Sequence, residues 1–374
     1  MVTIILFIVI LGVLIFVHEL GHFVTARRNG VKADEFGFGF PPRMAGFVRD
    51  EETGKFKFVW GNKDIESKHT VYSINWIPLG GFVKIKGEDG SGVAEPDSFA
   101  AKKAWPRIKI LAAGVVMNLV FAWFAISLSL MIGAPEAIDY NAGTDVPGSK
   151  IQISQIMPGS PAERAGLKIG DEIIKSSDGR VVFGNISDFQ NFNKINSNKE
   201  VGFDVKRGDE IIPIRATPEE KDGQGVIGVS LVQTVVVKYP AYQAVWKGAI
   251  AVYDLTILIL VSLGGILASI FTGHGVGADV SGPIGIAILT KQVAALGFVH
   301  ILQFAAMLSI NLAIINALPI PALDGGRIMF ILIEKVKGSP ISQKAEQSMH
   351  TVGFMLLILL MIAVTLRDVF KFIK

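Results

Sequence analysis

The sequence predicts a polytopic α-helical membrane protein with four transmembrane helices and one inserted β-rich domain. Half of its 374 residues are hydrophobic and only 18% are charged, which is too apolar for an ordinary soluble protein of this length. Four apolar runs approach the roughly 20 residues that a helix needs to cross a hydrocarbon core of about 30 Å. A segment of alternating hydrophobicity, long enough for a domain, separates the second run from the third.

Charge and cysteine content exclude several kinds of protein. The formal net charge is only +3 and is spread along the chain, so no basic patch for nucleic acid is expected. The absence of cysteine excludes disulfides, iron–sulfur clusters and thiol nucleophiles. Any bound metal must therefore be held by nitrogen and oxygen ligands.

Each transmembrane helix is predicted from an apolar run and from the residues that end it. The first run lacks the basic segment and the cleavage site of a signal peptide, so we expect it to stay attached. Pro135 ends the second run, and Pro319 and Pro321 lie near the end of the third. The four predicted helices are residues 1–26, 105–134, 297–324 and 348–371.

Lysine and arginine residues beside the apolar runs predict which loops face the cytoplasm. They are concentrated in residues 27–104 and in residues 325–346, so both loops are expected in the cytoplasm. The amino terminus and residues 136–235 then lie outside. The basic residues from Arg367 onward conflict mildly with an outside carboxyl terminus, although flanking charges bias topology without fixing every end.

The external segment, residues 136–235, has the pattern of a compact β domain. Residues 150–156 alternate as a strand, and the run PGSPAERAGLKIGDEIIKSSDG after them resembles a PDZ domain. Gly225, Ile227 and Gly228 resemble its peptide-binding loop, in the circularly permuted bacterial type. The resemblance implies an extracytoplasmic PDZ-like domain that binds the carboxyl ends of peptides along a sheet edge. The alternative is a spacer or a filter by size.

The first predicted helix contains the pattern His-Glu-x-x-His, formed by His18, Glu19 and His22. On a helix, residues four apart share a face, so both imidazoles can reach one metal ion, and zinc is the natural choice. Ionisable groups in a membrane span are costly and normally mark function. The alternative is that these three residues only pair with polar groups of other helices, which would not explain why costly ionisable groups are placed in a span.

A catalytic zinc typically takes three protein ligands, so one more is required. The end of the third apolar run offers Asp324, in the stretch NLAIINALPIPALDGG. Together with HELGH, this stretch is similar to the site-2 protease family of intramembrane zinc metalloproteases, of the bacterial PDZ-containing type. The resemblance covers almost the whole chain and implies one Zn²⁺ per chain, held by His18, His22 and Asp324. A simple helix-end turn at Asp-Gly-Gly is the alternative for the aspartate.

A fifth apolar stretch, residues 244–271, tests this pairing. It is too short for two crossings, and a single crossing would place Asp324 and His18 on opposite sides of the membrane. We therefore expect residues 240–295 to form an interfacial or re-entrant helix and a loop. Asp254 and a break at Gly264–Gly265 favour this interpretation.

Further roles come from the chemistry and from the resemblance. Zinc would acidify a water molecule whose proton Glu19 takes and later passes to the leaving amine. The resemblance implies that Asn316, with Pro319 and Pro321, positions the substrate. Asn311 is a further candidate, although contacts between helices would explain it equally well, as they would Asn118.

The resemblance also implies the substrates and the place of action. The loop segments FGFGF and GGFVKI would form a membrane-associated β-element that offers an edge to the substrate; an ordinary cytoplasmic sheet is the alternative. Substrates would be single-span membrane proteins, such as trimmed anti-sigma factors or remnant signal peptides, in the bacterial cytoplasmic membrane. Two other functions stay open: a non-catalytic membrane-anchored PDZ scaffold, and a zinc membrane enzyme that acts on another bond.

Overall fold

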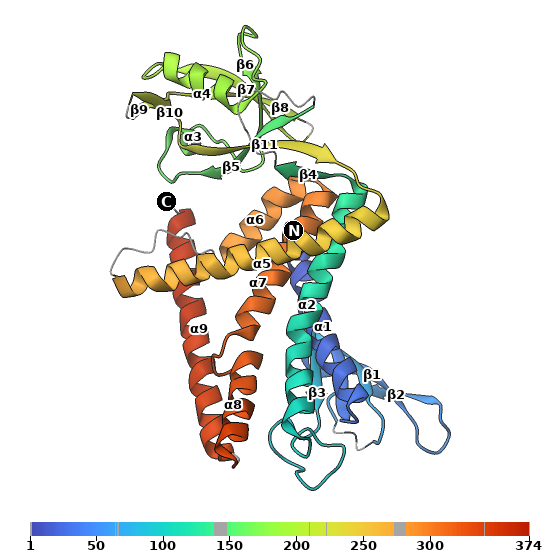
Figure 1. The fold of residues 1–374 in the computed structure, drawn as a ribbon. Helices are drawn as coiled ribbons and strands as arrows, with labels where there is room; N and C mark the ends of the chain where they lie inside the picture. Colours follow the sequence, from blue (N-terminus) through green and yellow to red (C-terminus); the bar gives the residue numbers. More distant parts are fainter. Residues whose placement is uncertain are drawn as a thin grey trace. The chain divides into compact units, whose positions relative to one another are not determined.

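The computed structural model describes residues 2–63, 65, 67–137, 148–208, 210–221, 223–272, 282–339 and 341–373. The chain divides into two compact units, whose elements are labelled in Figure 1. The first, here called the membrane unit, comprises residues 1–126, 248–287 and 305–374. The second, here called the β unit, comprises residues 127–247 and 288–304.

Five helices in the described ranges are long and apolar enough to cross a membrane. Four of them match the predicted spans: α1 (Val2–Arg28), α2 (Ala104–Ile132), α7 (Phe298–Ala317) and α9 (Gln343–Ile373). The fifth is α5 (Ala241–Thr272). These helices and the β-rich unit confirm the predicted class, a membrane protein with a β domain.

Helix α5 corrects one detail of the sequence-based prediction. It runs through Gly264 and Gly265 without a break, so the expected interruption there is wrong. A glycine costs only about 1 kcal/mol in a helix interior, and the long apolar residues on either side favour the helix. Helix α6 (Pro283–Leu296) follows, and its 14 residues extend about 21 Å. Within the predicted interfacial segment, residues 273–281, with His274 and Ser281 among them, lie outside the described residues.

The region around the two prolines also differs from the prediction. Helix α7 ends at Ala317 rather than at residue 324, because Pro319 and Pro321 cannot continue the backbone ladder. A separate helix, α8 (Asp324–Lys337), occupies much of residues 325–346, which we predicted to be a loop. Its buried residues, Phe330 and Ile331 among them, form an apolar stripe that packs inward and stabilises the helix.

Between α1 and α2, the membrane unit carries an antiparallel sheet of β1 (Ala33–Arg49), β2 (Phe56–Trp60) and β3 (Val71–Ile85). The strand order is β2-β1-β3, so β3 is an edge strand. The sheet lies against α1, where the rings of Phe16 and Phe36 are 5.3 Å apart. Ala26, Ile110 and Leu111 belong to a buried cluster that joins α1 to α2.

The β unit contains a six-stranded antiparallel sheet with the order β4-β11-β5-β6-β7-β8. A hairpin of β9 (Glu219–Lys221) and β10 (Gln224–Val226) and the helices α3 (Pro161–Arg164) and α4 (Ile186–Ile195) accompany it. Phe189 and Phe203 are central to its core. The strands of the sheet are β4 (Ala134–Ala137), β5 (Lys150–Ile156), β6 (Glu172–Ser176), β7 (Val201–Arg207), β8 (Glu210–Ala216) and β11 (Val229–Val237).

Candidate metal centre

Two histidines on one face of α1 form the base of the candidate metal centre. His18 and His22 lie one helical turn apart, and their Nε2 atoms are 3.1 Å from each other. Both side chains are buried, with exposed fractions of 7% and 6%. Two imidazole nitrogens that face each other in an apolar helix have no structural need for this closeness. A shared cation would explain it.

Asp324 completes the cluster from the first turn of α8. Its Oδ2 lies 3.0 Å from Nε2 of His18 and 3.3 Å from Nε2 of His22. The turn after α7 delivers it, and Gly326 makes this turn possible: a Cβ there would lie 2.2 Å from the carbonyl oxygen of Ile320. The Asp-Gly-Gly sequence therefore lets α8 start directly against the end of α7.

Helix α2 forms the wall behind the histidines. The carbonyl oxygen of Ile110 lies 2.8 Å from Nδ1 of His22, and the side-chain amide of Asn118 lies 3.1 Å from Nδ1 of His18. Between them, Gly114 leaves room for both rings, since a Cβ there would lie 2.5 Å from Nε2 of His22. The sequence did not point to Ile110 or Gly114, although Gly114 lies four residues before the polar Asn118 in an apolar run, a spacing that puts both on one helix face.

Glu19 lies beside the cluster and contacts the sheet. Its Oε2 accepts a hydrogen bond of 3.2 Å from the backbone N–H of Val83 in β3. Because this N–H points away from β1 toward Glu19, it lies on the free edge of the strand. The carboxylate is thus held between the histidines and a strand edge.

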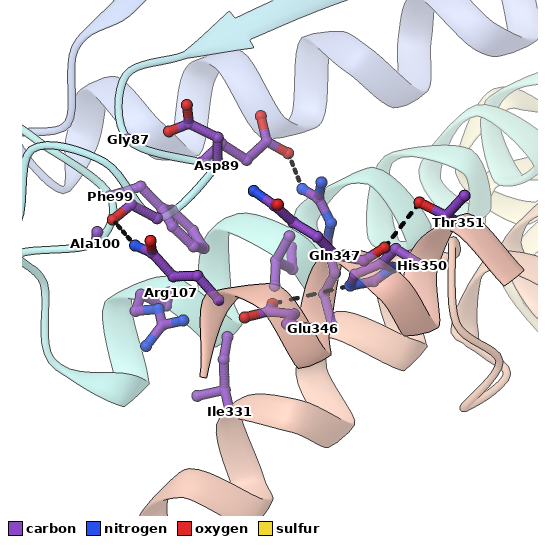
Figure 2. Close-up of a pocket in the computed structure, with 15 residues that line it drawn as sticks. Gly87, Asp89, Phe99, Ala100, Arg107, Ile331, Glu346, Gln347, His350 and Thr351 are labelled. Atoms are coloured by element: carbon purple, nitrogen blue, oxygen red, sulfur yellow. Dashed lines mark hydrogen bonds and ion pairs between the residues drawn. The ribbon is translucent and has the colours of Figure 1, made fainter. Parts of the chain in front are cut away.

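The cluster opens into a cavity of about 450 Å³ that His18, Glu19, His22 and Asp324 line together. A second cavity of about 390 Å³ adjoins it, and Figure 2 shows that its lining combines charged and polar side chains such as Arg107 and Glu346 with apolar ones such as Phe99 and Ile331. Five residues line both cavities: Glu88, Leu111, Arg327, His350 and Thr351. An ion pair between Arg327 and Glu88 lies among them.

The three side chains fit a zinc ion. Ligands about 2.0 to 2.1 Å from a tetrahedral zinc lie about 3.3 Å from one another, close to the three separations in the cluster. The ligand atoms all lie within 4.8 Å of one another. Apart from the two histidine Nε2 atoms, the buried Oδ2 of Asp324 has no polar partner among the described residues, as expected for an atom aimed at a shared cation. Two nitrogens and one oxygen are a common donor set of catalytic zinc.

The predicted substrate-positioning residues lie in the last two turns of α7 and in the turn that follows it. Asn311 donates a 3.0 Å bond to the carbonyl oxygen of Met307, within its own helix. Asn316, Pro319 and Pro321 do not line the cavity of the metal cluster. Their role in substrate binding stays a prediction.

The predicted peptide-binding loop lines a cavity in the β unit. Gly225, Ile227 and Gly228 border a space of about 380 Å³ together with residues of α4. Asn193 of α4 also borders it, and its buried Oδ1 has no hydrogen-bond partner among the described residues. The predicted loop therefore borders a cavity, and the binding of a peptide there stays a prediction.

Comparisons with known proteins give a consistent result. The sequence model of peptidase family M50 matches residues 6–62 and 58–360. The chain is 30% identical to the regulator of sigma-W protease RasP of Bacillus subtilis, with 98% of each chain covered. It is also 30% identical to the zinc metalloprotease RasP of Geobacillus kaustophilus, over 99% of this chain and 98% of the relative. The RasP of Oceanobacillus iheyensis is 28% identical over 99% of both chains.

Proposed function

Because this chain belongs to peptidase family M50, the site-2 proteases, and is a zinc metalloprotease, we propose that it hydrolyses peptide bonds inside or next to the membrane spans of single-span proteins. One observation carries this proposal: an oxygen of Asp324 converges with the Nε2 atoms of His18 and His22, which lie beside Glu19 in an apolar helix long enough to cross a membrane. A chain that belongs to a peptidase family does not fit the alternative of a membrane-anchored PDZ scaffold without catalysis.

The roles of the four residues follow from their chemistry. His18, His22 and Asp324 would hold the zinc, which would supply a Lewis acid for the scissile carbonyl and for the attacking water. Glu19 takes a proton from that water and returns it to the leaving amine. Its bond to Val83 holds the carboxylate in place for both transfers.

The membrane topology follows from the meeting of α1 and α7. Since His18 near the end of α1 lies against Asp324 just after α7, the two helices end on the same side. Between them, α2 crosses the membrane once in the opposite direction. If α5 also crossed, α7 would end on the side opposite to the end of α1. Helix α6, about 21 Å long, is too short to restore the order. We therefore propose four spans, with the site near the cytoplasmic face of an inner-membrane protein.

In this topology α5 lies along the outer interface. Its first turns carry Tyr242, Trp246 and Tyr253, all exposed aromatic side chains of the kind that anchor helices at the headgroup level. Lys247 and Asp254 add charges that such a helix keeps in water.

Substrate presentation would use the free edge of β3. A transmembrane helix hides its peptide bonds in its own hydrogen bonds, so the substrate must unwind before it is cut. An unwound segment can pair with β3, whose residues Gly80 and Gly81 lie against Ile15 and Phe16 of α1. The scissile bond then passes beside Glu19.

The β unit would select substrates outside the membrane. Its cavity at Gly225, Ile227 and Gly228 would take the carboxyl end of a substrate already trimmed by another protease, as in a PDZ domain. The Bacillus subtilis relative is named a regulator of sigma-W protease, which favours substrates that control a sigma factor, such as anti-sigma factors. Remnant signal peptides are the second proposed class of substrate. The alternative use, exclusion of untrimmed substrates by size, needs no bound peptide.

The test is cleavage of a tagged single-span protein by the purified enzyme in detergent, with the products weighed by mass spectrometry. We expect a cut within the apolar segment by the wild type and none by Glu19→Gln or after chelation. Zinc retained by Glu19→Gln shows that its loss of activity is chemical. If the enzyme binds zinc but cleaves no single-span substrate, the proposed reaction is wrong. That result would favour a zinc enzyme that acts on another kind of bond.

A further inference from the structure

One face of α2 holds both histidines of the metal cluster. Ile110, Gly114 and Asn118 follow each other at intervals of four, so they form a single stripe along the helix. Ile110 contacts the ring of His22, Gly114 lies against both rings, and Asn118 contacts the ring of His18. These contacts orient the rings without contributing a ligand.

The contact to His22 fixes the proton of its ring. A carbonyl oxygen only accepts hydrogen bonds, so the 2.8 Å contact from Ile110 requires the proton of His22 to sit on Nδ1. Its Nε2 then carries a lone pair toward Asp324, as a metal ligand must. No side chain is needed, because the helix backbone supplies the acceptor.

The contact to His18 comes from a side chain that can turn either way. Asn118 is fully buried, with an exposed fraction of 0%, and its amide nitrogen lies 3.1 Å from Nδ1 of His18. A half-turn about χ2 exchanges the amide oxygen and nitrogen. The oxygen, Oδ1, is buried and has no hydrogen-bond partner among the described residues. A buried unpaired acceptor costs about 1 to 3 kcal/mol, which the half-turn recovers for that atom.

Only one of the two arrangements suits a metal ligand. If the amide nitrogen donates to Nδ1, the ring proton sits on Nε2 and blocks the lone pair that faces the cluster. We propose that Asn118 is a positioning residue that accepts the Nδ1 proton of His18 through Oδ1 and so directs the Nε2 lone pair of His18 toward His22 and Asp324. This inference rests on the proposed ligand set.

A second contact ties Asn118 to the helix that precedes Asp324. The hydroxyl of Ser309 in α7 donates a 2.8 Å bond to the backbone carbonyl of Asn118, and both residues are fully buried. The residue that orients His18 is therefore fixed to the helix that leads to the third ligand. A small shift of α7 would therefore move Asp324 directly and His18 through Asn118.

The experiment compares zinc affinity, by competition with a chelator, in the full-length wild type and three variants. Asn118→Leu keeps the volume and loses the acceptor, so we expect zinc to bind about 10 to 100-fold more weakly, as for lost partners of ligating histidines. Asn118→Asp keeps an acceptor and loses the donor, and we expect near wild-type affinity. Ser127→Ala, a buried polar residue farther along α2, is the control and should match the wild type.

A spectroscopic signature separates positioning from packing. With ¹⁵N-labelled histidine in the zinc-loaded wild type, His18 should show a proton on Nδ1 and zinc on Nε2. Wild-type affinity in Asn118→Leu, equal weakening in Asn118→Asp, or a bare Nδ1 at His18 would each overturn the inference. If Asn118→Leu does not fold, Asn118→Asp and the His18 signal decide. A wild type without zinc would instead contradict the proposed function itself.

Discussion

At the scale of residues, the metal centre depends on two kinds of information in the chain. His18 and His22 are four apart on one helix, so their shared face follows from helix geometry alone. Their orientation depends on α2, whose contact to His22 joins residues 88 positions apart. That contact uses a backbone carbonyl, which every residue type possesses, and so leaves no trace in the sequence.

Gly114 gives a prediction at this scale. In Gly114→Ala the new Cβ would lie 2.5 Å from Nε2 of His22 and 2.6 Å from Cε1 of His18, so the rings must move apart. We expect zinc affinity and cleavage to fall by about tenfold or more, while alanine favours the helix itself. Metal analysis and the cleavage assay measure this. Gly264→Ala, in an open part of α5, is the control, and equal effects of both variants would contradict the account.

Val83 gives a second prediction. Proline at this position removes the N–H that holds Glu19 and breaks no bond to β1, because the N–H points to the free edge. A hydrogen bond to a charged group contributes about 1.5 to 3 kcal/mol, so the turnover of Val83→Pro should fall about 10 to 100-fold with zinc retained. Val83→Ala keeps the N–H and should remain active. An unchanged rate in Val83→Pro would show that Glu19 needs no help from β3.

At the scale of elements, hydrophobic periodicity and helix-breaking prolines indicate where helices lie and end better than the distribution of charge does. Pro319 and Pro321 explain why α7 ends at Ala317. The charges of residues 325–346 indicated a cytoplasmic loop, yet α8 forms there. A loop and a helix can carry the same charges, so charge alone does not tell them apart. The signal for a helix was the apolar stripe that includes Phe330 and Ile331.

The β unit gives a prediction at this scale. Asp171 is buried just before β6 and accepts two bonds, of 2.7 and 2.6 Å, from Arg207 of β7. Arg207→Met removes the cation and leaves the carboxylate with the backbone N–H of Lys168 as its hydrogen-bond donor, which should destabilise the β unit by about 3 to 5 kcal/mol. Hydrogen exchange of the strand amides in the full chain measures this. Arg180→Met, which breaks an exposed pair with Asp178, should change little, and similar exchange in both variants would contradict the assignment.

At the scale of the whole molecule, composition and run length were enough to predict a membrane protein with a β domain. They could not place α5, because its 32 residues are apolar enough to cross and long enough to lie along the surface. We propose its position from the contact between His18 and Asp324, because this contact sets the parity of the crossings between α1 and α7. That contact depends on tertiary packing, which hydropathy does not contain.

Single cysteines test the position of α5, and the absence of native cysteine makes the labelling clean. We place one cysteine at Gln243 and another at Ala268, near the two ends of the helix. In intact cells or sealed vesicles, both should react with an impermeant reagent from the outer side. Labelling of the Ala268 position from the cytoplasmic side alone would mean that α5 crosses, and the four-span topology would be wrong.

The ligand set is the centre of the account, and a crystal of the zinc-loaded protein measured at the zinc absorption edge tests it most directly. We predict one anomalous peak per chain, about 2.0 to 2.2 Å from Nε2 of His18, Nε2 of His22 and a carboxylate oxygen of Asp324. A zinc peak at other residues, or one that lacks any of these three ligands, would contradict the account.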